Sequence, residues 1–202
     1  RSSDLGNPDV SPASYTWVVD TAAPDTSIDS QPADPSASAD ASFGFSGDDT
    51  SGTGVASFEC KLDTGAFAAC SSPQSYTGLA DGSHTFAVRA LDALANADAS
   101  PAAYTWVVDT AAPDTSIDSQ PADPSNSASA SFGFGGDDTS GTGVSSFECK
   151  LDAGAFAACS SAKSYTGLAD GSHTFAVRAL DGASNPDASP ATYTWVVDTA
   201  AP

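Results

Sequence analysis

The chain has 202 residues and a formal charge of −20, from 24 Asp, two Glu and only six Lys plus Arg. Such an acidic surface repels phosphate backbones and anionic lipid headgroups, so we expect no nucleic-acid binding and no direct membrane insertion. The sequence also lacks an apolar run of about 18 residues, which excludes an ordinary transmembrane helix.

A period of 89 residues organises the chain. Trp17, Trp106 and Trp195 stand 89 residues apart, and the stretches 25–113 and 114–202 align without a gap, with 77 of 89 positions identical. Such a period predicts an array of small domains, because each unit is long enough for one core. The sequence therefore reads as an excerpt of a longer polymer.

We expect four parts along the chain. Residues 1–20 match the end of a unit and predict the last strand of a truncated preceding repeat. Residues 21–109 and 110–198 form the two complete repeats, and residues 199–202 start the next junction.

Within the first repeat, short alternating runs are separated by Gly, Pro, Asp and Ser clusters, a pattern typical of strands. It predicts strands at residues 26–30, 37–46, 55–62, 66–70, 74–77, 84–92 and 102–109. Seven short strands in 89 residues indicate an all-β fold, a Greek-key β-sandwich of two sheets, repeated as beads on a string. A small closed barrel is the alternative.

Two motifs carry a family resemblance. One is Leu79-x-x-Gly82-x-His84-x-Phe86-x-Val88-Arg89-Ala90-x-Asp92-x-x-x-Asn96 followed by Thr105-Trp106-x-Val108-Asp109, and the other is Phe58-Glu59-Cys60-x-Leu62-Asp63-x-Gly65-x-Phe67 with Cys70. They resemble the bacterial Ig-like (fibronectin-III-like) tandem repeats of large secreted or cell-surface proteins. Such repeats usually have Gly before the Asn of the last loop. Ala95 and Ser184 stand there instead, which leaves open whether the turn differs between the copies.

The four cysteines form one pair per repeat, Cys60 with Cys70 and Cys149 with Cys159. Each pair is ten residues apart across a Gly-containing hairpin, where symmetrically placed residues approach disulfide distance. An even count favours intra-domain disulfides and an exported protein. Buried free thiols and a metal site are the alternatives, and two Cys with one His per repeat are too few for a zinc site.

The two histidines, His84 and His173, share the inward parity of Phe86 and Phe175 and follow a Leu-x-x-Gly corner. Sandwiches often place an aromatic residue there whose polar tip bonds the corner backbone. We therefore expect structural corner residues. A catalytic base needs a nearby nucleophile and an orienting group, and no such constellation is present in the sequence, so we expect no enzymatic activity.

Acidic loops are the main polar feature. Four pairs of positions lie in loops that a sandwich of this topology brings to one end of each domain: Asp48 and Asp49, Asp92 and Asp98, Asp137 and Asp138, Asp181 and Asp187. The junction from Asp109 to Asp114 enters at the same end. Converging carboxylates predict a Ca²⁺ site that stiffens the junction, while the alternative is solvated turn aspartates with no cofactor.

These features predict a structural, non-catalytic segment of an extracellular or cell-surface protein whose domains form an elongated stalk. Its expected partners are neighbouring repeats of the same protein. One alternative is a self-assembling filament, in which the N-terminal strand pairs with another copy. A second is a repeated glycan- or surface-binding adhesion module. The second is disfavoured because four of the 12 differences between the copies lie in the loop 93–97.

Overall fold

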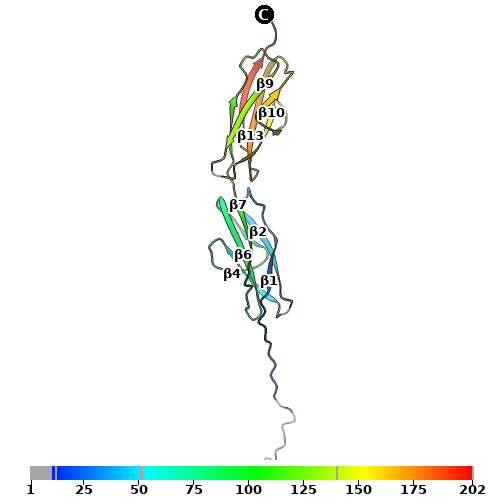
Figure 1. The fold of residues 1–202 in the computed structure, drawn as a ribbon, viewed down its shortest axis with the longest axis vertical. Coiled ribbons are helices and arrows are strands. Elements are labelled where there is room, and N and C mark those ends of the chain that lie inside the picture. Colours follow the sequence, from blue (N-terminus) through cyan, green and yellow to red (C-terminus); the bar gives the residue numbers. More distant parts are fainter. Residues whose placement is uncertain (1–10, 12, 51, 140, 202) are drawn as a thin grey trace, which may run out of the picture.

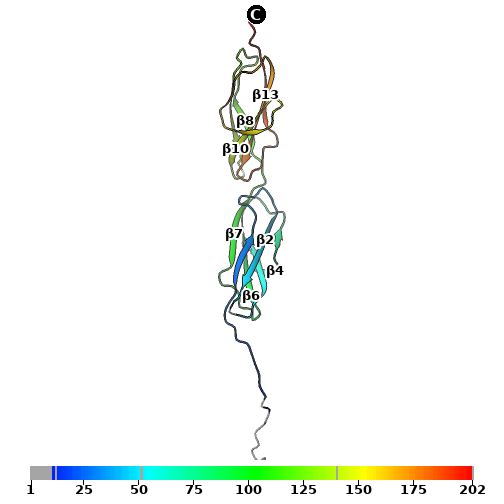
Figure 2. The same ribbon diagram turned by 90° about the vertical axis from the view of Figure 1, so that its right-hand side faces the viewer.

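The computed structural model describes residues 11, 13–50, 52–139 and 141–201, and the regular elements in these ranges are all strands. Figures 1 and 2 show two β-sandwiches stacked end to end along one axis. We call them module 1, built from β1–β7, and module 2, built from β8–β14. An extended N-terminal segment leads into module 1, and the C-terminus lies at the far end of module 2.

Each module has seven strands in two antiparallel sheets. Those of module 1 are β1 (Asp25–Ser30), β2 (Ala41–Asp48), β3 (Val55–Leu62), β4 (Ala68–Cys70), β5 (Gln74–Tyr76), β6 (Gly82–Asp92) and β7 (Ala102–Val108). They form a three-stranded sheet of order β1-β2-β5 and a four-stranded sheet of order β4-β3-β6-β7. The chain crosses between the sheets after β2, β4 and β5. This is the predicted sandwich, and the separate sheets exclude the closed barrel.

Module 2 follows the same plan. Its strands are β8 (Asp114–Ser119), β9 (Ala130–Asp137), β10 (Val144–Leu151), β11 (Ala157–Cys159), β12 (Lys163–Tyr165), β13 (Gly171–Asp181) and β14 (Ala191–Val197). The sheet orders β12-β9-β8 and β11-β10-β13-β14 match those of module 1 strand for strand.

The second strand begins later than the sequence predicts, at Ala41 instead of residue 37. The residues before it run beside the end of β7 instead of continuing β2. The Ser36 amide donates to the Val107 carbonyl, and the Asp109 amide donates to the Ser36 carbonyl. This short parallel bridge covers part of the open edge of β7, and covering is one way in which edge strands avoid further pairing.

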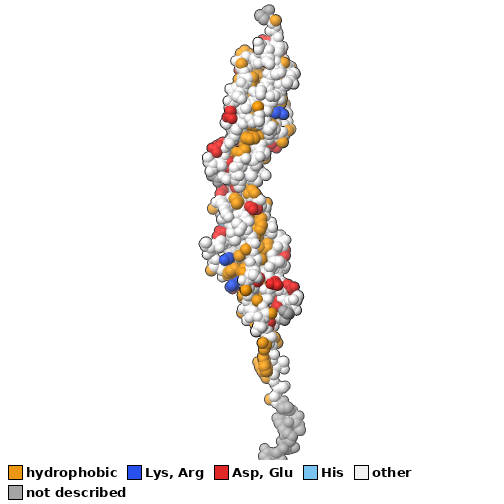
Figure 3. Space-filling model, viewed as in Figure 1, with side chains coloured by type: hydrophobic (Ala, Val, Ile, Leu, Met, Phe, Trp, Pro, Cys, Tyr) orange, Lys and Arg blue, Asp and Glu red, His pale blue; other side chains and the backbone are white. Residues whose placement is uncertain are grey.

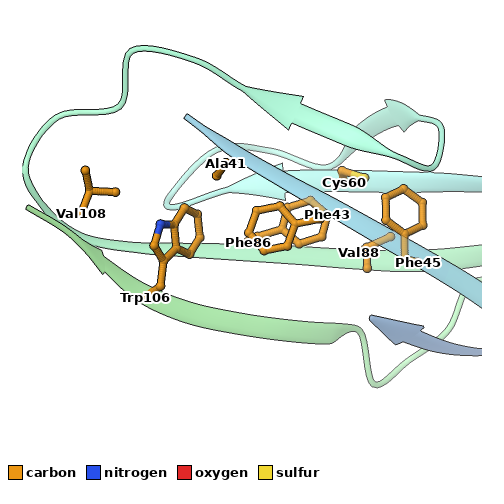
Figure 4. Close-up of a cluster of buried hydrophobic side chains, with 8 residues drawn as sticks. All are labelled: Ala41, Phe43, Phe45, Cys60, Phe86, Val88, Trp106 and Val108. Atoms are coloured by element: carbon orange, nitrogen blue, oxygen red, sulfur yellow. The ribbon is translucent and has the colours of Figure 1, made fainter. Parts of the chain in front are cut away.

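The core of module 1 lies between the two sheets, as Figure 4 shows. Alternate residues of β2 point inward, which buries Ala41, Phe43 and Phe45. The Phe43 ring stacks on Phe86 with centroids 4.1 Å apart, and Trp106 packs edge-on against Phe43 at 5.1 Å. The equivalent residues of module 2 pack in the same way. Stacked and edge-on aromatic pairs contribute beyond the area that they bury.

Candidate functional site

The segment between the modules, residues 109–113, is the candidate site. β7 ends at Val108 and β8 begins at Asp114. The Asp109 carboxylate accepts a hydrogen bond from the Thr142 amide of module 2 at 2.6 Å. The next residue, Thr110, bonds back to Asp81 of module 1 through its amide and its hydroxyl, both at 2.9 Å. Neighbouring residues are therefore held from opposite sides, which restrains the junction.

Three carboxylates meet at this junction, and we call them the Asp109 triad: Asp109, Asp138 and Asp181. One oxygen from each lies within 4.8 Å of the others, and Asp109 and Asp181 are each only 1% exposed. Asp109 follows β7, Asp138 follows β9, and Asp181 ends β13. Three segments far apart in the sequence therefore supply the cluster.

The loop between β9 and β10 wraps the triad with its backbone. Gly143, at φ +78°, donates its amide to Asp138 Oδ2 at 2.8 Å. A Cβ on Gly141 would lie 2.6 Å from Oδ2 of both Asp109 and Asp138, so only glycine fits at this position without a shift. These glycines explain why the loop between the second and third strands is glycine-rich.

Hydrogen bonds keep the junction carboxylate charged. Burial acts to raise the pKa of Asp109, but bonds from the Thr142 hydroxyl and amide and from the Ala111 amide outweigh it, so the pKa lies below its ordinary value. Asn185 donates its side-chain amide to the Asp181 carboxylate at 2.7 Å and to the Asp109 carbonyl at 2.8 Å. An ionised Asp109 lies beside two more carboxylates, and a bound cation would relieve the repulsion among them.

The same arrangement precedes module 1, where Asp20, Asp49 and Asp92 form the Asp20 triad. Asp20 Oδ2 accepts the Thr53 amide at 2.6 Å, and the Asn96 side chain bonds both Asp92 and the Asp20 carbonyl. The pKa of Asp92 is also lowered, because hydrogen bonds from Asn96 and Leu94 outweigh the effect of burial.

The structure therefore brings together half of the aspartates predicted as metal ligands: Asp49, Asp92, Asp138 and Asp181. It places the other half, Asp48, Asp98, Asp137 and Asp187, outside these two clusters. Asp48 and Asp137 pair with Asp25 and Asp114 in the strand ladders. Asp98 and Asp187 are buried and accept bonds from Ser100 and Ser189, so they close a turn.

Sequence reasoning missed the third member of each triad, Asp20 and Asp109. Both end the recurring motif Tyr-Thr-Trp-Val-Val-Asp, which also ends at Asp198. The sequence predicts the junction at this end of the domain but does not single out its first residue as a ligand. An aspartate that ends the same strand in three copies was the available signal.

The donor set of each triad fits a calcium ion. Ca²⁺ takes six to eight oxygen ligands, and carboxylates can bind it through one or both oxygens. Asp109, Asp138 and Asp181 each bring one carboxylate oxygen within 4.8 Å of the other two, from three segments of the chain. Cation binding would neutralise the repulsion among them and tie the junction to two loops of module 2.

Two disulfides join β3 to β4 and β10 to β11. They link Cys60 to Cys70 and Cys149 to Cys159, each with 5.8 Å between the Cα atoms. In each hairpin the antiparallel register pairs the first cysteine with an alanine, Ala68 or Ala157, and the second with a phenylalanine. The described residues contain no free cysteine.

His84 and His173 lie near the start of β6 and β13, just after the corner that leads into each strand. His84 Nδ1 is 2.9 Å from Asp63 Oδ2, and its Nε2 is 2.9 Å from the Ala80 carbonyl oxygen. His173 has the same two contacts, with Asp152 and Ala169. Since both partners are acceptors, the imidazolium satisfies both. The Ala80 carbonyl and then the Asp63 carboxylate raise the pKa of His84 above its ordinary 6.5.

We expect the protein to lose stability as the pH rises through this raised pKa. The histidine contribution is fully present below 6.5, the ordinary value, and is lost above the folded-state pKa. Each partly exposed pair should contribute up to about 1 kcal/mol. Urea unfolding at a series of pH values measures the effect. A variant with His84→Gln and His173→Gln should lose this dependence, and an unchanged profile in the variant would contradict the assignment.

The residue before the asparagine of the last loop has the same left-handed backbone in both copies. Ala95 has a φ of 65° and Ser184 a φ of 71°, the left-handed region that favours glycine. The turn that the sequence left open is therefore the same in both modules, despite the different residues. It places Asn96 and Asn185 against the triads.

Comparison with known proteins identifies the fold. No protein-family model and no curated protein matches the chain. The fibronectin(III)-like modules of Clostridium thermocellum CbhA match with a TM-score of 0.54 and 16% identity, over 85% of this chain and 93% of that chain. Dimeric latent PorU from Porphyromonas gingivalis matches with a TM-score of 0.35 and 13% identity, over 93% of this chain and 22% of that chain. The first match, together with the three- and four-stranded sheets, identifies Ig/fibronectin-III-like β-sandwiches.

Proposed function

We propose that this chain is a spacer segment of a secreted or cell-surface protein, in which modules joined end to end provide length. The clamped junction carries the proposal, because Asp109 and Thr110 are held by module 2 and module 1 respectively. Two intra-module disulfides support an oxidising compartment. The described part of the chain has no helix long and apolar enough for a bilayer crossing.

The surface supports a structural role over catalysis or sugar binding. A shallow cleft of about 420 Å³ at the end of module 2 is lined by Ala122, Pro124, Ser125, Asn126 and Asp198, which include no nucleophile paired with a base. Among the described residues of the modules, the strongly exposed large hydrophobic side chains are Leu94 and Val196, and neither is aromatic. Sugar-binding platforms usually need exposed aromatic rings.

Small-angle X-ray scattering of the full chain tests the spacer function. We expect the elongated profile of two modules in line, as drawn in Figures 1 and 2. A compact profile, with the modules folded back side by side, would contradict the proposal. Pro113, which is buried in the junction, supports the elongated outcome because it removes backbone freedom there.

We also propose that Ca²⁺ binds the two triads and stiffens the junctions. Ligand at about 100 times its dissociation constant would stabilise a module by about 2.7 kcal/mol. The unfolding temperature should therefore rise in millimolar calcium and return to its original value after chelation. Asp138→Asn should abolish the shift for module 2, whereas Asp137→Asn, next to it but outside the triad, should keep it. Equal melting curves with calcium and with chelator would contradict calcium binding.

A second candidate function is assembly by strand donation. Tyr15, Trp17, Val18 and Val19 are at least 68% exposed, and Figure 3 shows hydrophobic side chains along the N-terminal segment. Their sequence matches strands β7 and β14, whose Trp and second Val are buried. A segment of this kind can complete a sheet of another copy. Light scattering on the full chain and on a chain lacking residues 1–19 separates the cases. Assembly that depends on these residues supports donation, while a monomer at all concentrations contradicts it.

A further inference from the structure

The two triads differ in the hydrogen bonds of one hydroxyl group. In module 2, Thr142 Oγ1 donates to Asp109 Oδ2 at 2.7 Å and accepts the Ala183 amide at 3.1 Å. In module 1 the equivalent Thr53 keeps only the bond from its amide to Asp20. Its Oγ1 is buried and has no hydrogen-bond partner. Buried polar atoms without partners are rare and costly, so the difference needs a cause.

The residue after the last aspartate of the sixth strand provides that cause. It is Gly182 in module 2 and Ala93 in module 1. A Cβ on Gly182 would lie 2.9 Å from both Cβ and Oγ1 of Thr142, too close without a shift. Ala93 carries a real Cβ at the equivalent position. The threonine therefore cannot adopt the same conformation in module 1, and its hydroxyl loses the aspartate.

The backbone hydrogen bonds of the loop after the sixth strand also differ between the two modules. The Gly182 amide donates to the Gly143 carbonyl at 3.0 Å, which links the two loops that wrap the Asp109 triad. In module 1 the Leu94 amide, equivalent to that of Ala183, donates instead to Asp92 Oδ1 at 2.9 Å. The loop after β6 is thus tied to its own aspartate there and not to the threonine that holds the junction.

We propose that this single position sets how firmly each junction is held. Glycine at 182 admits a lock in which the Thr142 hydroxyl connects the junction carboxylate to the following loop. Alanine at 93 excludes the lock, so the Asp20 triad is held less firmly than the Asp109 triad. The hydrogen bonds of the lock do not depend on the proposed spacer function. The consequence of the lock for the stiffness of the rod rests on that function.

The lock also gives a structural consequence to the sequence differences in the loop after the sixth strand. Positions 93–97 hold four of the 12 differences between the copies, and the rest of the junction machinery is unchanged. Gly182 has no left-handed φ, so alanine at this position meets a steric conflict with Thr142 and no backbone strain. The copies therefore keep one architecture and differ in how tightly consecutive units are coupled.

Amide hydrogen exchange on the full chain tests the lock directly. Gly182→Ala should speed exchange of the Ala183 amide by about tenfold, as expected for the loss of one hydrogen bond. Ala93→Gly should slow exchange of the amide at position 93, because this amide can then donate to the Gly54 carbonyl as Gly182 donates to Gly143. The second result is decisive, since glycine by itself increases backbone freedom and would speed exchange.

Two variants of Thr142 separate the effect of its hydroxyl bonds from the steric effect of a Cβ at position 182. Thr142→Val removes the hydroxyl while Gly182 stays, so it should loosen the Ala183 amide as Gly182→Ala does. Thr142→Ser keeps the hydroxyl and should retain protection. If Thr142→Val leaves the Ala183 amide as protected as in the wild type, the lock does not exist.

The distribution of distances between spin labels on the two modules reports the stiffness of the junction, independently of amide exchange. Gly182→Ala and Thr142→Val should each broaden the distribution, and Thr142→Ser should not. Loss of amide protection without broadening would keep the lock but overturn its link to stiffness. An unlocked junction in a chain that still scatters as an elongated rod would overturn the lock and leave the spacer function intact.

Discussion

Replacing Trp195 with Ala should nearly unfold module 2, while the same change at Trp17 should leave stability unchanged. The two residues sit in almost identical sequences, but Trp195 is 1% exposed and Trp17 is 68% exposed. Truncating a buried Trp costs about 3–5 kcal/mol. A module of this size has only about 5–15 kcal/mol in total. Differential scanning calorimetry should show one transition shifted sharply downward and the other in place.

Trp195→Phe provides the matched control for packing. It keeps an aromatic ring against Phe132, whose centroid is 5.1 Å from that of Trp195. It also removes an indole Nε1 that is buried without a hydrogen-bond partner. We therefore expect a much smaller loss than for alanine. If Trp195→Ala and Trp195→Phe lowered the stability of module 2 equally little, Trp195 would not be a core residue. That result would contradict the packing of the two sheets around it.

Replacing both Cys149 and Cys159 with Ala should destabilise module 2 by about 2.7 kcal/mol, the loop-entropy value for a crosslink that closes about ten residues. The loss should be confined to module 2, because Cys60 and Cys70 lie in a separate core. Chemical denaturation followed through the two modules separately measures it.

Reduction of the wild type supplies the control for this prediction. A reductant should lower the stability of both modules, whereas the double alanine variant should show a further loss only in module 1. A variant as stable as the wild type would mean that the hairpin does not depend on its crosslink. A loss in both modules of the variant would mean that the two cores are coupled.

Strand pattern and core were predictable because burial has a simple period. In β2 the inward residues Ala41, Phe43 and Phe45 alternate with polar or glycine neighbours, so the sequence alone identifies the face. The start of β2 was wrong by four residues, because the parallel bridge of Ser36 to Val108 joins positions far apart in sequence. No local pattern distinguishes that bridge from a longer strand.

The candidate site was only partly predictable, for a related reason. Asp48 and Asp49 are adjacent and carry the same side chain, but Asp48 pairs in the strand ladder whereas Asp49 lies at the triad. Which of two neighbouring carboxylates turns inward depends on where the strand ends. The role of Gly182 was also hidden, because it depends on a steric contact with Thr142 across two loops.

The most direct test of the account is the relative orientation of the two modules in solution. Residual dipolar couplings on the full chain give an alignment tensor for each module. Because Asp109 and Thr110 are clamped from opposite sides, we predict tensors of equal magnitude and a common orientation when both modules are placed as in Figure 1. Tensors of clearly different magnitude would show independent tumbling and contradict a rigid junction.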